Sequence, residues 1–156
     1  MEIVLLNCGR TEPKLLDEQM SELEKRIQRY QKYSRVDCQP ARSKSAAREQ
    51  LMQKEAEALN KELRPGDRVI LLDENGRSMN SRGFAQQMQK WMNAGSHRIV
   101  FVSGGAYGFD QQMRRRADDS LSLSPMTCTH QLIRLFFLEQ LYRCFTILNG
   151  HPYHND

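Results

Sequence analysis

The sequence lacks any apolar run close to the roughly 20 residues that a helix needs to cross a bilayer. Its first residues, MEIVLLNCGR, hold an apolar stretch too short for a signal peptide, with Glu2 before it and no small-residue cleavage site. We therefore expect a protein that neither spans a membrane nor is exported, and that works in the cytoplasm.

Cysteine is scarce, with four residues at positions 8, 38, 128 and 144, and no two of them form a CxxC pair. Structural zinc sites and the disulfide frameworks of small secreted domains both depend on closely spaced cysteines. The sequence therefore predicts free thiols in a reducing compartment, and it predicts no metal site.

The familiar phosphate-binding motifs are also missing. The glycine-dense segment SGGAYG, residues 103–108, is not G-x-G-x-x-G, and no GK[ST] follows it, which argues against a dinucleotide fingerprint and a P-loop. Taken alone, the segment is most simply a tight turn. The alternative is that its missing side chains let backbone N–H groups approach a ligand closely.

Apolar residues make up 39% and charged residues 27% of the 156-residue chain, as expected for a folded domain with a net charge of +4. The charge is uneven: residues 25–48 carry eight basic residues against only Asp37, and Arg114–Arg116 form a second basic cluster. Either cluster alone is most simply a solvated helix face. Two clusters in a small basic domain favour a polyanionic partner such as nucleic acid.

Short apolar runs alternate with segments of helical spacing along the whole chain. Strands are predicted at 2–9, 35–40, 67–76, 97–105 and 121–124. Helices are predicted at 14–33, at 43–63 with Ser45 as a cap, at 80–95 with Asn80 or Ser81 as a cap, at 110–117 and at about 130–148. This alternation predicts a single-domain α/β fold around a parallel sheet.

Ligands of open parallel sheets bind beyond the carboxyl ends of the strands. The segments 72–76, 103–108 and 124–128 follow predicted strands, so we expect them to meet at one edge. In the last of these, Pro125 keeps Ser124 extended, and Thr127 or Thr129 can cap the following helix. Its backbone amides suit an adenine edge, although an ordinary capped helix start explains the segment equally well.

The final helix is apolar around most of its circumference, whereas a surface helix needs only one apolar stripe. In so small a domain, a subunit interface is the expected second cover, which predicts a dimer. Arg134, Glu139 and Arg143 lie on this helix and must be partnered or face a site, and the i, i+4 spacing of Glu139 and Arg143 favours an ion pair.

The tail after this helix, NGHPYHND, carries two histidines, a tyrosine and a proline where chain ends usually fray. Either it is docked in a groove, or it acts on something that binds there. The stretch from Gly104 to His154, SGGAYG and then LSLSPMTCTHQLIRLFFLEQLYRCFTILNGHPYH, closely resembles the RlmH (YbeA-like) family of SPOUT RNA methyltransferases. The strand VILLDENG and the chain length match this family as well.

The resemblance implies a C-terminal trefoil knot, S-adenosylmethionine as the methyl donor, and a homodimer with the final helix in its interface. It implies methylation of N3 of a pseudouridine in a stem-loop of large-subunit (23S) ribosomal RNA, on the free RNA or the ribosome. The residues that match the family's donor site are Leu72, Gly104, Leu123, Ser124, Pro125, Met126, Thr127 and Cys128.

The resemblance also implies that the tail meets the target base beside the donor. Tyr153 would stack on that base, and His154 or a carboxylate, for which Glu139 is the candidate, would accept the N3 proton. Arg143 would steady the developing negative charge. The sequence departs from the family pattern at Ala106 and Tyr107 in the glycine turn and at Asn155, where a basic residue is expected.

Two other functions remain open on the sequence. A non-catalytic RNA-binding protein that keeps the fold would gain no thermal stability from S-adenosylmethionine. A metal-dependent hydrolase built on His151 and His154 would need a third clustered ligand, and HxxH on a non-helical tail is a weak metal signature.

Overall fold

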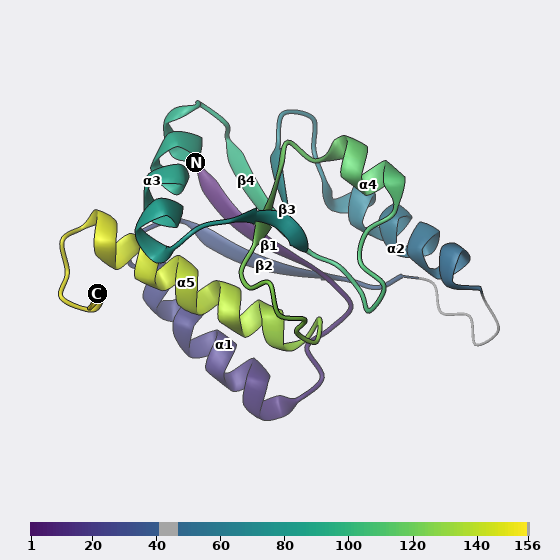
Figure 1. Cartoon of the computed structure of the whole chain (residues 1–156), viewed down its shortest axis with the longest axis horizontal. Helices are drawn as coiled ribbons and strands as arrows, with labels where there is room; N and C mark the ends of the chain where they lie inside the picture. The colour runs from purple at the N-terminus through teal and green to yellow at the C-terminus, as the bar shows by residue number, and fades with distance from the viewer. Residues whose placement is uncertain (41–46, 156) are drawn as a thin grey trace.

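A five-stranded parallel sheet forms the centre of the computed structural model, which describes residues 1–40 and 47–155 (Figure 1). The strand order is β2-β1-β4-β3-β5. Every neighbouring pair is parallel, and the inner strands are buried on both faces, which explains their unbroken apolar runs. The strands are β1 (Glu2–Cys8), β2 (Tyr33–Cys38), β3 (Arg68–Ser78), β4 (Arg98–Ser103) and β5 (Asp119–Ser122).

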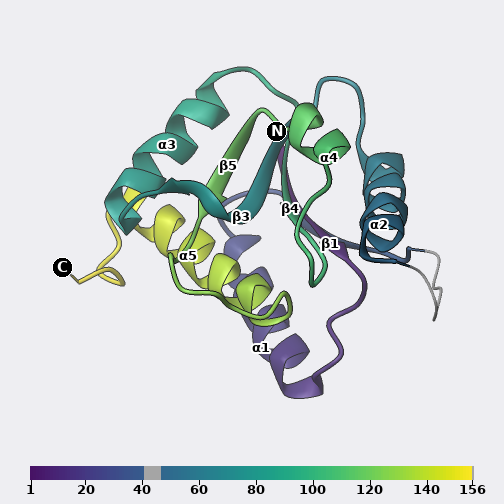
Figure 2. The ribbon, with the colours of Figure 1, turned by 45° about the vertical axis from the view of Figure 1, so that its right-hand side comes forward.

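Helices cover both faces of the sheet, as Figures 1 and 2 show. The five helices of the described chain are α1 (Lys14–Ile27), α2 (Arg48–Glu62), α3 (Ser81–Asn93), α4 (Gln111–Arg116) and α5 (Leu132–Leu148). α1, α3 and α5 enclose one apolar cluster, which includes Phe101 and Phe137, while α2 and α4 enclose another on the opposite face, which includes Val100 and Met113. The predicted α/β fold with a parallel sheet is confirmed.

Several predicted boundaries are wrong. The first helix ends at Ile27 instead of reaching residue 33, because Tyr30 leaves the helix to stack on Phe145 of α5. The second begins at Arg48 after an extended Ala47, and the proposed cap Ser45 lies outside the described residues. β5 begins two residues before the predicted strand, which leaves 123–124 in the following loop.

β3 continues to Ser78, although the sequence predicted its end near residue 76 and placed 72–76 after it. Its pairing with β5 slips between Leu72 and Arg77, so residues 73–76 bulge out of the regular ladder at the carboxyl end of the sheet. A Cβ on Gly76 would lie 2.8 Å from backbone atoms of Ser120 and Leu121. Only glycine lets β3 run this close to β5, and the bulge shapes the site described next.

Candidate functional site

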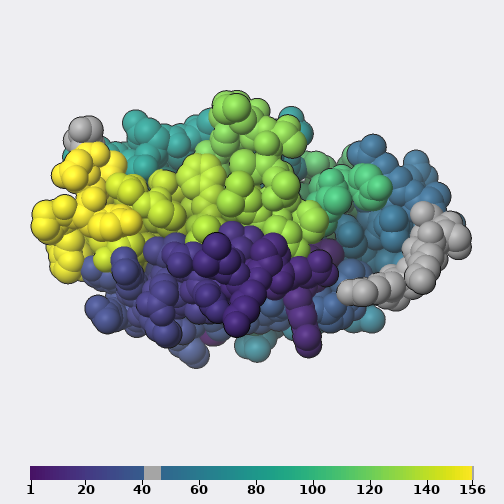
Figure 3. All heavy atoms as spheres, turned by 90° about the horizontal axis from the view of Figure 1, so that it is seen from below, coloured from purple at the N-terminus to yellow at the C-terminus, as the bar shows by residue number. Residues whose placement is uncertain are grey.

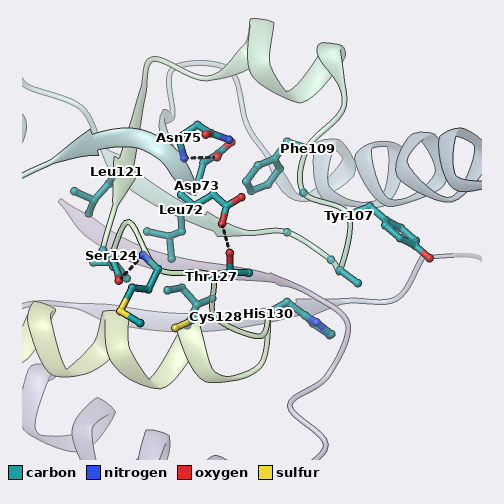
Figure 4. A pocket seen from close by; sticks show the side chains of 18 of the residues that line it. Leu72, Asp73, Asn75, Tyr107, Phe109, Leu121, Ser124, Thr127, Cys128 and His130 are labelled. Atoms are coloured by element: carbon teal, nitrogen blue, oxygen red, sulfur yellow. Dashed lines mark hydrogen bonds between the residues drawn. The ribbon is translucent and has the colours of Figure 1, made fainter.

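A cavity of about 390 Å³ opens at the carboxyl ends of β3 and β4 (Figure 4). The three segments expected to converge do so. Its walls are Leu72–Asn75, Gly104–Phe109, Leu121, Leu123, Ser124, Met126–Cys128, His130 and Ile133, with Arg48 and Arg114 contributed by α2 and α4. Of the eight residues matched to the family's donor site, all but Pro125 line this cavity.

The glycine turn is packed from behind, which explains its lack of side chains. A Cβ on Gly104 would lie 3.1 Å from two ring atoms of Phe109, and one on Gly105 would collide with the carboxylate of Glu55. The turn closes with a hydrogen bond from the N–H of Gly108 to the carbonyl of Gly105 (3.2 Å), with Gly108 at φ 77°. The turn therefore rests directly on α2 and Phe109.

The loop before α5 is held by its own hydroxyl groups. The Ser124 hydroxyl accepts the N–H of Met126 (3.0 Å), and Ser122 donates to the Ser124 carbonyl (3.1 Å). Thr127 donates to Glu74 of β3 (3.2 Å), one of the contacts drawn in Figure 4. Of the two threonines predicted as caps, Thr129 is the one that accepts the N–H of Leu132 (3.2 Å).

Charged groups flank the cavity in both signs. Asp73 has an almost fully buried side chain and pairs with Arg114 at 2.6 Å, and it also accepts the N–H of Asn75 (2.9 Å). Burial, followed by the nearby Arg134 guanidinium, lowers the pKa of His130. A neutral His130 and paired Asp73 leave the inner wall with little net charge.

Arg134 is one of the three charged residues of α5 that were expected to be partnered or to face a site. It is fully buried, and it donates to the Cys8 carbonyl (2.8 Å), the Thr11 hydroxyl (3.0 Å) and the Ser103 hydroxyl (3.4 Å). Burial lowers its pKa, although an arginine stays protonated at neutral pH. Because Ser103 directly precedes Gly104, Arg134 ties α5 to the strand ends that carry the glycine turn.

The four residues expected to be catalytic form a second cluster, at the end of α5. Glu139 and Arg143 make the predicted ion pair through two contacts, at 2.5 and 3.4 Å. Tyr153 donates to Glu139 (3.3 Å), and its ring lies 4.9 Å from the Arg143 guanidinium. The guanidinium also lies 3.3 Å from Nδ1 of His154, and since arginine only donates, this nitrogen is the acceptor.

The tail after α5 packs against the rest of the chain, in agreement with the first of the two alternatives, that it is docked. The Tyr153 ring packs on Tyr142 with centroids 4.8 Å apart, and the hydroxyl of Tyr30, which follows α1, lies 3.0 Å from Nδ1 of His151. Burial and the neighbouring Glu139 raise the pKa of Tyr153, and the hydrogen bond to Glu139 raises that of Arg143. At neutral pH the cluster therefore presents a protonated phenol and a guanidinium.

Within one chain, this tail cluster and the cavity are separate. None of Glu139, Arg143, Tyr153 and His154 lines the cavity. Figure 3 shows the tail at the far end of the molecule from α2, in agreement with Figures 1 and 2. The expectation that the tail lies against the cavity is therefore not met inside a single protomer.

Comparison with known proteins places this architecture in a family. The family model described as "Predicted SPOUT methyltransferase" matches residues 1–154, so the chain belongs to the SPOUT methyltransferases, which take their methyl group from S-adenosylmethionine. A solved structure described only as a hypothetical protein shares the fold, with a TM-score of 0.54, 14% identity, and coverage of 94% of this chain and 68% of its own.

Curated relatives narrow the family. A protein of Christiangramia forsetii is 42% identical over 156 residues, covering 99% of both chains, and one of Bacteroides thetaiotaomicron is 41% identical over 160 residues, covering all of both. A Bacteroides fragilis relative is 49% identical over 114 residues, covering 73% of both. All three bear the name "Ribosomal RNA large subunit methyltransferase H".

The cavity fits the family's donor. Its size lies within the range of about 300–1,000 Å³ typical of small-molecule sites. Leu72, Leu121 and Leu123 offer apolar surface for an adenine, and the glycine turn offers backbone without side chains. The Glu74 carboxylate, which accepts the Thr127 hydroxyl, lies on the wall for a cationic ligand, while Asp73 is paired with Arg114.

Within residues 1–40 and 47–155, no three His, Cys, Asp or Glu side chains gather as a metal site would require. No helix in these ranges is long and apolar enough to cross a bilayer.

Proposed function

We propose that the chain methylates large-subunit ribosomal RNA at N3 of a pseudouridine in a stem-loop, and that it does so in the cytoplasm as a homodimer. The observation that carries the proposal is the cavity at the strand ends, where the segments matched to the family's donor site form a single wall. The names of full-length relatives at 41–42% identity support ribosomal RNA as the substrate.

The donor would be held by Leu72, Gly104 and the loop 123–128. When bound, it would supply an activated methyl group, which passes from the positively charged sulfur to the nucleophile and leaves the sulfur as a neutral thioether. The chain's own part is to fix this loop before binding, through the Ser124 and Thr127 hydroxyls, and to offer apolar surface from Leu72, Leu121 and Leu123 beside it. Preorganisation of this kind aligns the two reactants and lowers the barrier without covalent help from the protein.

The nucleophile is N3 of the target base, which must first lose its proton. Two groups in the tail cluster are candidates to accept it. Nδ1 of His154 already accepts from Arg143, so His154 takes a proton there only after Arg143 shifts away. The Glu139 carboxylate is the other candidate, and Arg143 and Tyr153 both donate to it. In either case Arg143 would exchange one of its hydrogen bonds, to Glu139 or to His154, for one to the developing negative charge.

Tyr153 is better suited to contact the base than to accept its proton. Its raised pKa keeps the phenol protonated at neutral pH, and its side chain is 38% exposed. An aromatic ring with an exposed face suits stacking on an unpaired base. The Arg143 guanidinium against the ring adds a cation beside that base.

A second copy of the chain would bring the tail cluster to the cavity. The surface available for it lies between α3 and α5, where a groove of about 240 Å³ is lined by Met79, Phe84, Leu123 and Phe136. Leu132, 47% exposed on α5, extends this apolar surface. We include the C-terminal trefoil knot in the proposal, because the family implies it.

Tritium transfer from labelled S-adenosylmethionine tests the proposal, with free 23S ribosomal RNA and assembled large subunits assayed in parallel. We expect label at one pseudouridine in at least one substrate, mapped by nuclease digestion and mass spectrometry. A thermal shift assay separates the alternatives, since a donor at 100 times its dissociation constant adds about 2.7 kcal/mol of stability. The absence of a shift would contradict donor binding and indicate a non-catalytic RNA-binding protein that keeps the fold. A shift without transfer to either RNA would show donor binding and contradict the proposed substrate.

A further inference from the structure

Tyr107 and Arg48 line the cavity, but neither belongs to the residues matched to the family's donor site or to the tail cluster. Ala106 and Tyr107 form the tip of the tight turn that Gly105 and Gly108 close. Tyr107 is 46% exposed, and it is one of six large apolar or aromatic residues that are exposed in the described part of the chain. The turn therefore presents an aromatic ring to solvent at the rim of the cavity.

A cation lies on that ring. The guanidinium carbon of Arg48, the first residue of α2, is 5.1 Å from the Tyr107 ring centroid, and both residues line the cavity. Arg48 makes no ion pair with a carboxylate in the described part of the chain, so its charge is available to an incoming group. Arg48 covers part of the ring, and the exposed fraction shows that much of the ring stays open.

The ring is directed outward. Figure 4 shows the Tyr107 side chain pointing away from Leu72, Ser124 and Cys128, with its hydroxyl at the far end. The donor's expected contacts are on that inner side, so the ring is placed to meet something that approaches the rim from outside. A flat aromatic surface beside an unpaired cation is the arrangement by which proteins hold single-stranded RNA, with a base on the ring and a phosphate on the cation.

We propose that Tyr107 and Arg48 form a stacking platform for an unpaired nucleotide of the RNA substrate, next to the nucleotide that enters the cavity. The platform would make a contact at the rim of the cavity, through residues other than those matched to the donor site and those of the tail cluster. It rests on the proposed function in taking RNA as the partner, and it adds a contact that sets which loop can be presented. Its chemistry requires an exposed base and a phosphate, and it does not require methyl transfer.

The experiment measures RNA binding by fluorescence anisotropy with a labelled 23S stem-loop transcript and, separately, a labelled single-stranded oligouridine. Saturating S-adenosylhomocysteine is present throughout, so a change in donor affinity does not enter the result. Tyr107→Ala should weaken binding of both RNAs at least about fivefold, the lower end for loss of one stacked base. Tyr107→Phe keeps the ring and should bind within about twofold of the parent.

Arg48→Gln tests the cation. Loss of one phosphate contact should flatten the dependence of log affinity on log salt concentration by about 0.7 for single-stranded RNA. The matched control is Lys90→Gln, because Lys90 is an exposed cation of α3 on the opposite face of the sheet, and this change should leave the slope unaltered. Combining Tyr107→Ala with Arg48→Gln should give less than the sum of the single effects, because the two side chains are in contact.

The donor's dissociation constant is measured on the same variants by calorimetry. Because Tyr107 and Arg48 also line the cavity, the platform requires RNA affinity to fall by a larger factor than donor affinity. Unchanged RNA affinity in Tyr107→Ala would overturn the platform, as would weaker donor binding with RNA affinity intact. RNA that fails to bind the parent at all would also overturn it. A parent that binds RNA but transfers no methyl group would contradict the proposed function alone and leave the platform standing.

Discussion

The donor cavity and the tail cluster are built on different principles. The cavity comes from the carboxyl ends of neighbouring parallel strands, which the sheet brings together whatever the loops contain. The tail cluster comes from one end of α5 and the residues that fold back on it, and its contacts are local, between positions 139 and 154. One chain therefore forms the whole cavity, whereas the tail cluster of the same chain does not line it.

This difference predicts that substitutions at the two sites separate cleanly into donor binding and turnover. A cavity variant should lose the donor and with it all activity. A tail variant should keep the donor and lose only rate. A tail variant with weakened donor binding, or a cavity variant that lost rate but kept the donor, would contradict this separation.

The largest effect is expected at the glycine turn. Gly104→Val places a branched side chain against the Phe109 ring, where even a Cβ lies at 3.1 Å, and it displaces the turn that forms the cavity wall. We expect no measurable donor binding by calorimetry and no methyl transfer. Gly104→Ala, in which Phe109 needs to yield by only a few tenths of an ångström, should bind the donor more weakly than the parent. Parental affinity in the valine variant would contradict this wall.

The next effect concerns turnover. His154→Ala should lower single-turnover methyl transfer by about 100-fold or more, the lower range for loss of a proton-transfer group. Tyr153→Ala should lower it by at least about fivefold, the lower end for loss of one stacked base. Their donor dissociation constants should match the parent, because neither residue lines the cavity. Tyr153→Phe keeps the ring on Tyr142 and should cost less than Tyr153→Ala. A tail variant that methylates RNA at the parental rate would remove the tail from the mechanism.

A smaller effect is expected in thiol reactivity. Cys128 is exposed and lines the cavity, whereas Cys8, Cys38 and Cys144 are buried, and burial raises the pKa of Cys144 to about 12. One thiol of the native protein should react quickly with a mild thiol-specific reagent, and Cys128→Ser should abolish this fast reaction. Donor at ten times its dissociation constant should slow the reaction about tenfold. An unprotected Cys128 would place the donor elsewhere.

The smallest effect is expected on stability. Arg134→Met removes a guanidinium that satisfies the Cys8 carbonyl and the Thr11 and Ser103 hydroxyls, and it leaves buried acceptors unpaired. We expect the free energy of unfolding in urea to fall by about 1–3 kcal/mol. Donor affinity should fall with it, because the Ser103–Gly104 strand end loosens. A variant as stable as the parent would show that α5 is anchored by packing alone.

The sheet and the cavity were predictable because they follow from simple periodicities. Unbroken apolar runs such as Val69–Leu72 mark strands buried on both faces, and the residues after them must meet at one edge. Boundaries were less predictable, since tertiary contacts decide them. Tyr30 fits a helical stripe but leaves α1 for Phe145, and Gly76 reads as a turn although it lets β3 continue beside β5.

The relation between tail and cavity was not predictable from spacing. The Glu139–Arg143 pair follows from i, i+4 geometry, and the docking of Tyr153 and His154 on it is a local consequence. Where that cluster acts would depend on how two chains pack in the proposed dimer, and the spacing of residues along one chain does not give that packing. The contact between Arg48 and Tyr107 was not predictable either, because α2 and the glycine turn are far apart in the sequence and meet only in the folded chain.

The most direct test of this account uses a mixed dimer, co-expressed with two different tags and purified through both. One chain carries Gly104→Val and lacks a working cavity, and the other carries Arg143→Ala and lacks a working tail cluster. If the tail of one protomer serves the cavity of the other, the mixed dimer holds one complete site and should transfer methyl groups at about half the parental rate. A mixed dimer that is no more active than the homodimers of the two variants would show that the tail does not act across the dimer.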